Sequence, residues 1–119
     1  MLSGILSSAI SGLNVNSQRT SAAADNIANV STANYKRTEI QAKSISVAQT
    51  SSTQYSPGGV LATSRQLSDV GPGAGALNNN VDLGTEFVNL INAETAYAAN
   101  LKVVRAGEDM AKALLDVKA

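Results

Sequence analysis

Two stretches near the opposite ends of this 119-residue chain carry seam positions spaced alternately four and three residues apart. Such spacing is typical of helices that pack along a coiled-coil seam, so it predicts two long helices over residues 2–30 and 82–116. The first seam runs through Leu2, Leu6, Ala9, Leu13, Asn16, Thr20, Ala23, Ile27 and Val30. The second runs through Leu83, Phe87, Leu90, Glu94, Tyr97, Leu101, Val104, Glu108, Ala111 and Leu115.

Neither helix is expected to be stable alone. Gly4, Gly12 and Gly107 each weaken a helix by about 1 kcal/mol relative to alanine. One possible outcome is a simple intramolecular hairpin that buries both seams and has no further role. Both apolar faces are wider than a strict seam, however, and exposed apolar stripes usually mark partner surfaces. Self-assembly is therefore the sharper interpretation.

The segment 31–81 has a different character, because Arg65 and Asp69 are its only charged residues between positions 44 and 81. Glycine and proline interrupt it repeatedly. Residues 38–40, 45–47 and 60–61 have the composition of short strands. We expect this segment to be extended, partly β, and ordered by contacts from outside the chain. The expected fold class is mainly α, with regions 1–30, 31–81 and 82–119 forming an assembly helix, a middle segment and a second assembly helix.

The composition excludes most chemistry. The chain has no histidine and no cysteine, which removes the commonest general base and the commonest metal ligands. Glu94 and Glu108 would lie about 21 Å apart on one helix, too far for a glycosidase pair. We therefore expect no enzymatic activity, catalytic residue, metal or cofactor. Nine basic residues balance nine acidic ones, which argues against nucleic-acid binding.

The first 13 residues are apolar in places, but serine and glycine interrupt them and no basic residue precedes Arg19. A secretory signal has a basic leader, and a membrane span needs about 20 predominantly apolar residues. We therefore expect neither a cleaved signal peptide nor a membrane span.

Two motifs resemble those of the bacterial flagellar basal-body rod and hook protein family. Residues 24–37 read ADNIANVSTANYKR, which is similar to the family's N-terminal pattern A-N-N-I-A-N-x-x-T-P-G-[YF]-K-[RA]. Residues 80–100 read NVDLGTEFVNLINAETAYAAN, which is similar to its C-terminal pattern N-V-D-L-x-x-E-x-V-x-[ML]-I-x-A-x-x-A-Y-x-x-N. The short middle is most like that of a proximal-rod protein, because it leaves no room for a large inserted domain.

The resemblance implies a structural subunit whose terminal helices polymerise into a hollow drive shaft for motility. The implied partners are other rod and hook subunits, copies of this chain and the flagellar type III export apparatus. The implied location is the periplasm-spanning rod of the basal body. The expected subunit-interface residues are Leu6, Leu13, Ile27, Asn29, Tyr35, Lys36, Phe87, Ile91, Tyr97, Asn100 and Leu101. The alternative from a different class is a soluble coiled-coil adaptor or export chaperone that binds partner helices.

The corner after the first helix departs from the family pattern, because Ala33 and Asn34 replace the usual Pro-Gly. Asparagine is the residue other than glycine that best tolerates positive φ, so we expect Asn34 to adopt a left-handed conformation. This turn would present Tyr35 and Lys36 to a neighbouring subunit. The alternative is a solvated loop in which Tyr35 folds back onto its own helix.

Overall fold

The computed structural model describes residues 2–45, 58–68 and 76–118. Helix α1 (Leu2–Ala28) is followed by strands β1 (Thr38–Ile45) and β2 (Gly59–Gln66), and helix α2 (Leu83–Lys118) completes the described chain. The predicted helices and mainly α fold class are confirmed. Strand β1 includes the predicted residues 38–40 and β2 includes the predicted 60–61, whereas residues 46 and 47 lie outside the described part.

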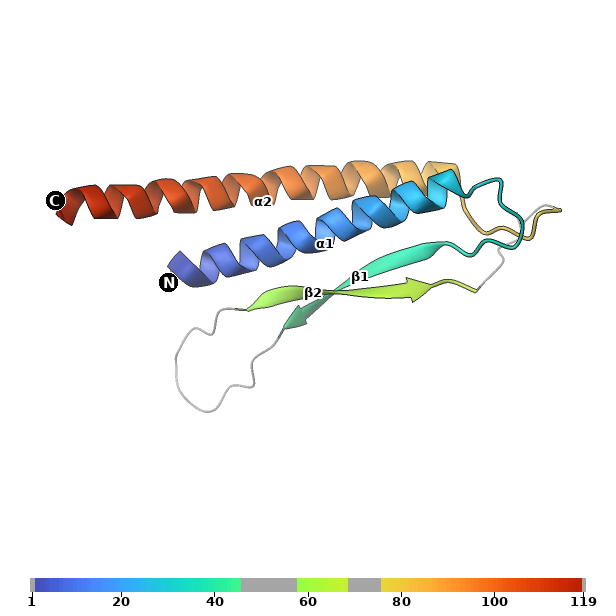
Figure 1. Ribbon diagram of the computed structural model, residues 1–119, viewed down its shortest axis with the longest axis horizontal. Coiled ribbons are helices and arrows are strands. Elements are labelled where there is room, and N and C mark those ends of the chain that lie inside the picture. The colour runs from blue at the N-terminus through green and yellow to red at the C-terminus, as the bar shows by residue number, and fades with distance from the viewer. Residues whose placement is uncertain (1, 46–57, 69–75, 119) are drawn as a thin grey trace.

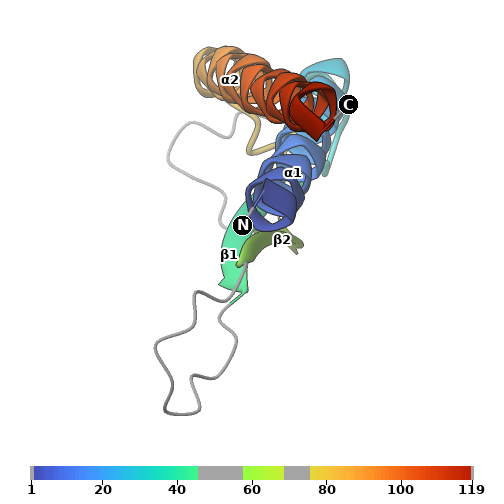
Figure 2. The same ribbon diagram turned by 90° about the vertical axis from the view of Figure 1, so that its left-hand side faces the viewer.

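The elements form three layers with α1 in the middle. Helix α2 packs antiparallel along one side of α1, and the two strands lie across the other side (Figures 1 and 2). The strands pair antiparallel, from Thr38 opposite Gln66 to Ile45 opposite Gly59. The last turns of α2 extend past the first turn of α1 (Figure 1). Helix α1 therefore needs two packing faces rather than the single seam expected from its apolar residues.

The contact between the helices consists largely of small and polar residues. On α1, the predicted seam positions Ala9, Asn16 and Ala23 are buried, which confirms that seam. On α2, the buried positions are Glu86, Ala93 and Gly107. They lie one residue before the predicted positions 87, 94 and 108, so these three positions of the predicted α2 seam are wrong.

Glycine explains why the helices choose this register. A Cβ atom on Gly107 would lie only 2.6 Å from Leu6 Cδ2, and one on Gly12 would lie 2.6 Å from Asn100 Nδ2. A side chain at either glycine would force Leu6 or Asn100 to move. Gly12 and Gly107, which weaken each helix in isolation, are thus places where a side chain of the other helix packs directly against the backbone.

The strands are held to the second face of α1 by side-chain hydrogen bonds. Asn26 Nδ2 donates to the Thr38 carbonyl and Asn26 Oδ1 accepts from the Thr38 N–H, at 2.8 and 2.9 Å. Further bonds run from Ser8 Oγ to Gly58 O, from Val60 N to Ser11 Oγ and from Arg19 Nε to Ile40 O. The expectation that the middle segment is ordered only from outside the chain is therefore wrong for the described residues, because α1 itself supplies the contacts.

Asn34 adopts φ of 59°, which confirms the predicted left-handed conformation. Its N–H donates to the Leu77 carbonyl at 2.8 Å, and its Oδ1 accepts from Asn78 Nδ2 at 3.1 Å. Asn78 is also left-handed, with φ of 50°. Two left-handed asparagines therefore join the turn after α1 to the segment that leads into α2.

We expect Gly12→Leu to lower the free energy of unfolding by about 1–3 kcal/mol, because the new side chain would overpack the contact with Asn100. The measurement is urea unfolding of the free chain in a stabilising osmolyte, followed by circular dichroism. Ser17→Leu is the matched control, since Ser17 is exposed on the same helix. Equal unfolding midpoints for the two variants would contradict the proposed close approach.

We expect Asn34→Val to destabilise the corner by about 1–2 kcal/mol, because a β-branched residue is strained at positive φ. Asn34→Gly keeps the backbone conformation and loses only the side-chain bond to Asn78, so it should be much milder. Unfolding midpoints, together with motility and basal-body yield, compare the two variants. Indistinguishable Val and Gly variants would show that Asn34 is not left-handed.

Candidate subunit interface

The corner, defined here as residues 29–37 and 76–82, joins the two motifs that the sequence carries at opposite ends. Asn79 Nδ2 donates to the backbone carbonyls of Asn29, Val30 and Thr32, at 2.8, 3.1 and 2.9 Å. The last carbonyls of a helix lack intrahelical partners, so this single amide satisfies acceptors just beyond the end of α1. The end of α1 is thus completed by a residue about 50 positions later in the chain.

Asn80 extends these connections to the strands. Its Oδ1 accepts from the backbone N–H of Arg37 at 2.7 Å, and its Nδ2 donates to the carbonyl of Leu67 at 2.7 Å. Arg37 precedes β1 and Leu67 follows β2, so one side chain ties the open end of the strand pair to the start of α2. The run of three asparagines at 78–80 is therefore structural.

Tyr35 folds back onto its own helix. Its hydroxyl donates to Asn26 Oδ1 at 3.1 Å, and the ring is half-buried. Burial, with a smaller contribution from the negative charge of Asp25, raises the pKa of Tyr35 above its ordinary value. Lys36 Nζ donates to the Asn78 carbonyl at 3.0 Å. Both residues thus have partners within the chain, and their expected contact with a neighbouring subunit stays a prediction.

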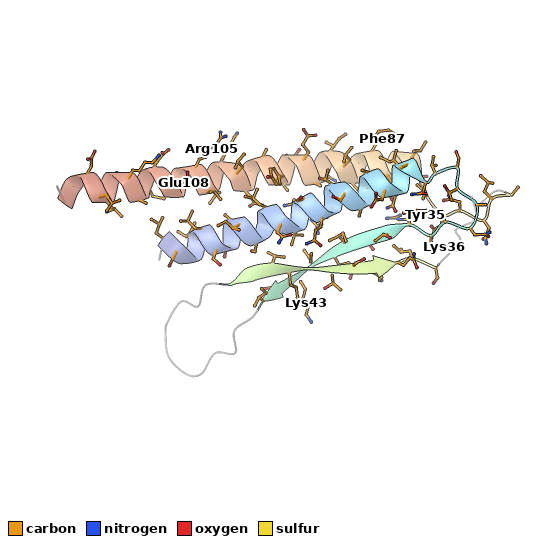
Figure 3. All side chains as sticks on the ribbon, viewed as in Figure 1. Tyr35, Lys36, Lys43, Phe87, Arg105 and Glu108 are labelled. Atoms are coloured by element: carbon orange, nitrogen blue, oxygen red, sulfur yellow. The ribbon has the colours of Figure 1, made fainter. Side chains whose placement is uncertain are left out.

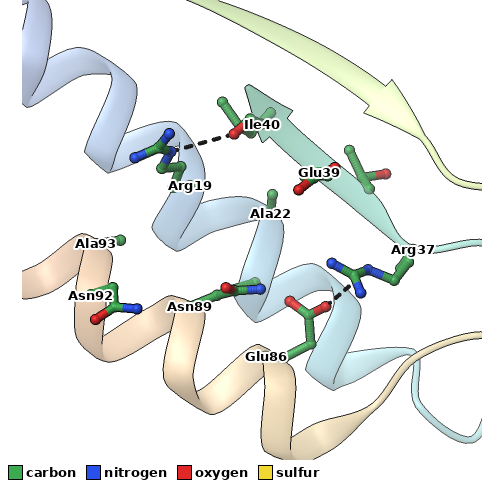
Figure 4. Close-up of a pocket in the computed structure, with 11 residues that line it drawn as sticks. Arg19, Ala22, Arg37, Glu39, Ile40, Glu86, Asn89, Asn92 and Ala93 are labelled. Atoms are coloured by element: carbon green, nitrogen blue, oxygen red, sulfur yellow. Dashed lines mark hydrogen bonds and ion pairs between the residues drawn. The ribbon is translucent and has the colours of Figure 1, made fainter. Parts of the chain in front are cut away.

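A buried ion pair lies where α1, β1 and α2 meet. Glu86 is only 1% exposed, and its Oε1 lies 3.3 Å from Arg37 Nε (Figure 4). The geometry is that of a charge pair, since neither of these two atoms has a hydrogen-bond partner among the described residues. Beside the pair is a hollow of about 230 Å³, lined by both partners together with Arg19, Ala22, Ala23, Thr38, Glu39, Ile40, Asn89, Asn92 and Ala93.

Asp82 starts α2 by capping its first turn. Its Oδ1 accepts from the Thr85 N–H at 2.8 Å, which is the usual arrangement at a helix N-terminus. This hydrogen bond stabilises the carboxylate and holds the pKa of Asp82 below its ordinary value. Asp82 belongs to the C-terminal motif, so this part of the motif defines where α2 begins.

The predicted interface residues fall into three groups. Leu6 and Asn100 lie in the contact between the helices, against Gly107 and Gly12, and Leu13, Ile27 and Leu101 are half-buried. Asn29, Tyr35 and Lys36 lie in the corner. Phe87, Ile91 and Tyr97 are exposed. The expectation that the seam positions Phe87 and Tyr97 are buried between the two helices is therefore wrong, whereas the contact of all three residues with other subunits stays a prediction.

Large apolar side chains remain on the outside. The buried apolar residues in the described chain are Ala9, Val15, Ala22, Ala23 and Ala93. By contrast, Phe87 is 51% exposed and Ile91 is 60% exposed. Leu83, Phe87 and Ile91 follow one another at four-residue spacing, so they share one face of α2, and Val88 lies beside them. We call these four residues the ridge; Figure 3 labels Phe87 near the corner.

A shallow hollow of about 290 Å³ lies toward the other end of the molecule. It is lined by Ile5, Ser8, Ala9, Asn100 and Val103, which come from both helices. We call it the notch. Ile5 and Val103 are each 42% exposed and supply its apolar sides.

Sequence reasoning missed Arg37, Glu86, Asn26, Asn79 and Asn80. A search for apolar periodicity ignores polar residues, although these five make the contacts that close the corner. The available signal was the seven-residue spacing of Glu86, Ala93, Asn100 and Gly107. That spacing marks a seam of small and polar residues beside the apolar one.

Among the residues that the structure describes, no group of three or more potential carboxylate, histidine or cysteine ligands gathers to hold a metal ion. In the same residues, neither helix has the combination of length and hydropathy required to cross a bilayer.

We expect Arg37→Ala to destabilise the chain by about 3 kcal/mol, because it leaves the buried Glu86 carboxylate without its counter-charge. The double variant Arg37→Leu/Glu86→Leu should recover much of this loss. Arg65→Ala is the matched control, since the pair between Arg65 and Glu39 is much more exposed and should contribute about 0–1 kcal/mol. Equal losses in unfolding free energy for the two alanine variants would show that the Arg37 pair is not buried.

Comparison with known proteins gives matches at both ends of the chain. Residues 6–36 match the family model described as flagella basal body rod protein. Residues 74–117 match the model described as flagellar basal body rod FlgEFG protein C-terminal. The flagellar hook proteins FlgE of Brucella abortus, Brucella suis and Brucella melitensis are each 40% identical over 86 residues, which cover 71% of this chain and 21% of the hook protein.

This chain thus spans about a fifth of the length of the hook proteins that it matches. The matched segments contain most of α1 with the corner turn at one end and nearly all of α2 at the other. They are the two parts that the asparagine contacts hold together. Because both ends carry the family's sequences in the expected order, the chain belongs to the flagellar basal-body rod and hook protein family, whose members are structural components of the flagellum.

Proposed function

We propose that this chain is a short subunit of the flagellar rod, most like a proximal-rod protein, which polymerises with neighbouring subunits through its terminal helices. The observation that carries this proposal is the distribution of apolar side chains. One chain buries mostly alanine between its layers and leaves the ridge and other large apolar residues in solvent. Exposed apolar surface of this extent is typical of a protein that completes its packing with partners.

Export in an unfolded state fits the same observation. A narrow export channel requires cargo that unfolds readily, and a hairpin with small residues at its centre gains little free energy from apolar burial. Assembly would then supply the missing burial and order the chain at its destination. The proposed partners are rod and hook subunits, copies of this chain and the flagellar type III export apparatus. The proposed location is the periplasm-spanning part of the basal body, reached without a cleaved signal peptide.

The proposal of a rod rather than a hook subunit rests on length. The two motifs are separated by the 42 residues 38–79, and the hook proteins are roughly five times longer than the part that this chain matches. The described part of the middle segment is a strand pair packed on α1. Such a subunit suits a position in the rod where the terminal helices form the hollow shaft and no large outer domain is required.

We expect Phe87→Asp to leave the free chain's helicity unchanged, because the side chain is already half in solvent. The same variant should lose most of its incorporation into basal bodies, since an unpaired charge is costly in an apolar contact. Basal-body yield and motility in cells that lack the wild-type chain provide the measurement. Ser17→Asp, at an exposed polar position on α1, should assemble normally.

Normal incorporation of Phe87→Asp would contradict the proposed role of the ridge. A free chain that is monomeric, stably helical and never found in isolated basal bodies would instead favour the adaptor or chaperone alternative. Circular dichroism and sedimentation of the free chain distinguish these cases, because a rod subunit should gain helical order when it assembles.

A further inference from the structure

The ridge lies near the start of α2, whereas Val103, the α2 residue that supplies an apolar side of the notch, lies further along the same helix. Phe87 and Val103 are 16 residues apart on α2, which corresponds to about 24 Å at ~1.5 Å per residue. One surface protrudes and is fully apolar, whereas the other is a hollow with apolar sides. A single chain cannot bring them together, because α2 is one continuous helix between them.

The notch suits the ridge better than does the hollow beside the ion pair. Arg19, Arg37 and Glu86 line that other hollow, so an apolar side chain inserted there would remove charged groups from water without replacing their partners. In the notch, Ile5, Ala9 and Val103 offer apolar contact instead. The notch is also open to solvent, so a side chain of another copy can reach its apolar sides.

Charge along α2 favours the same pairing. The exposed charges of the segment 82–94, which contains the ridge, are Asp82 and Glu94, since Glu86 is buried against Arg37. The segment 95–107, which contains Val103, carries Lys102 and Arg105 and no acidic residue. Two ridges brought together would place acidic segments side by side, whereas a ridge on a notch places an acidic segment beside a basic one.

We propose that the ridge of one copy docks in the notch of a second copy. This inference rests on the proposed function, because it specifies how a chain that assembles would meet its own copy. The contact is heterologous, since each copy uses two different surfaces. After one docking event a ridge and a notch remain free, so the contact continues as an open helical series and does not close a pair.

The absence of native cysteine makes the pairing directly testable. Phe87→Cys and Val103→Cys each place one thiol on an exposed apolar position. A disulfide requires Cα atoms within about 7 Å, so cysteines at these two positions cannot join within one chain. Any disulfide between them must therefore link two copies.

The experiment co-expresses the two single variants in flagellated cells, oxidises isolated basal bodies and resolves the chain on a non-reducing gel. We expect a disulfide-linked dimer in the mixture and little or none with either variant alone. The double variant Phe87→Cys/Val103→Cys should give a ladder of higher species. Phe87→Cys mixed with Ser17→Cys is the control pair and should remain monomeric.

A dimer formed by Phe87→Cys alone would overturn the proposal, because it would indicate ridge-to-ridge pairing. Absence of the mixed dimer from basal bodies that contain both variants would overturn it as well, while leaving the rod function intact. Absence of the wild-type chain from basal bodies, tested in parallel, would remove the proposed function and this pairing with it. Circular dichroism of each purified single variant verifies that the substitutions preserve the fold.

Discussion

At Gly12 and Gly107 the two helices approach so closely that a methyl group on either residue would collide with the facing side chain. Close approach of this kind requires small residues, and small residues bury little apolar area. Although Leu6 packs in this seam against Gly107, most of the exposed large apolar side chains lie on the outer surfaces of α2. The narrow seam within the chain thus leaves broad apolar surfaces exposed to solvent.

Polar contacts fix how the three layers are positioned relative to one another, because the narrow seam between the helices does not determine this alone. The Arg37–Glu86 pair and the amides of Asn26, Asn79 and Asn80 join all three layers at the corner. Hydrogen bonds are directional, so they specify one geometry even where apolar packing is weak. The corner therefore acts as the defined end of the molecule, and the helices extend from it toward the notch.

The family resemblance placed a turn at Asn34, and the tolerance of asparagine for positive φ predicted its left-handed conformation. Sequence periodicity predicted both helices and the strand-forming residues 38–40 and 60–61, because these features follow from local residue preferences. It placed part of the α2 seam one residue too late, because it followed Phe87 rather than the buried Glu86. It also missed the second face of α1, where Ser8, Ser11 and Asn26 bind the strands through hydrogen bonds rather than apolar contact. The ridge and the notch depend on which surfaces the fold covers, which local sequence does not specify.

The cap that Asn79 places on the end of α1 can form only late in folding. Asn79 is separated by 50 residues from Asn29, whose carbonyl it binds, so the cap forms only after the intervening chain is present and its ends have met. Closing such a loop costs chain entropy before the contact yields any stabilisation, and contacts of this kind form late in folding. A chain that emerges progressively from a ribosome or a narrow channel therefore keeps α1 without its cap until the asparagine run appears. The corner is therefore complete only when the N-terminal and C-terminal motifs have come together.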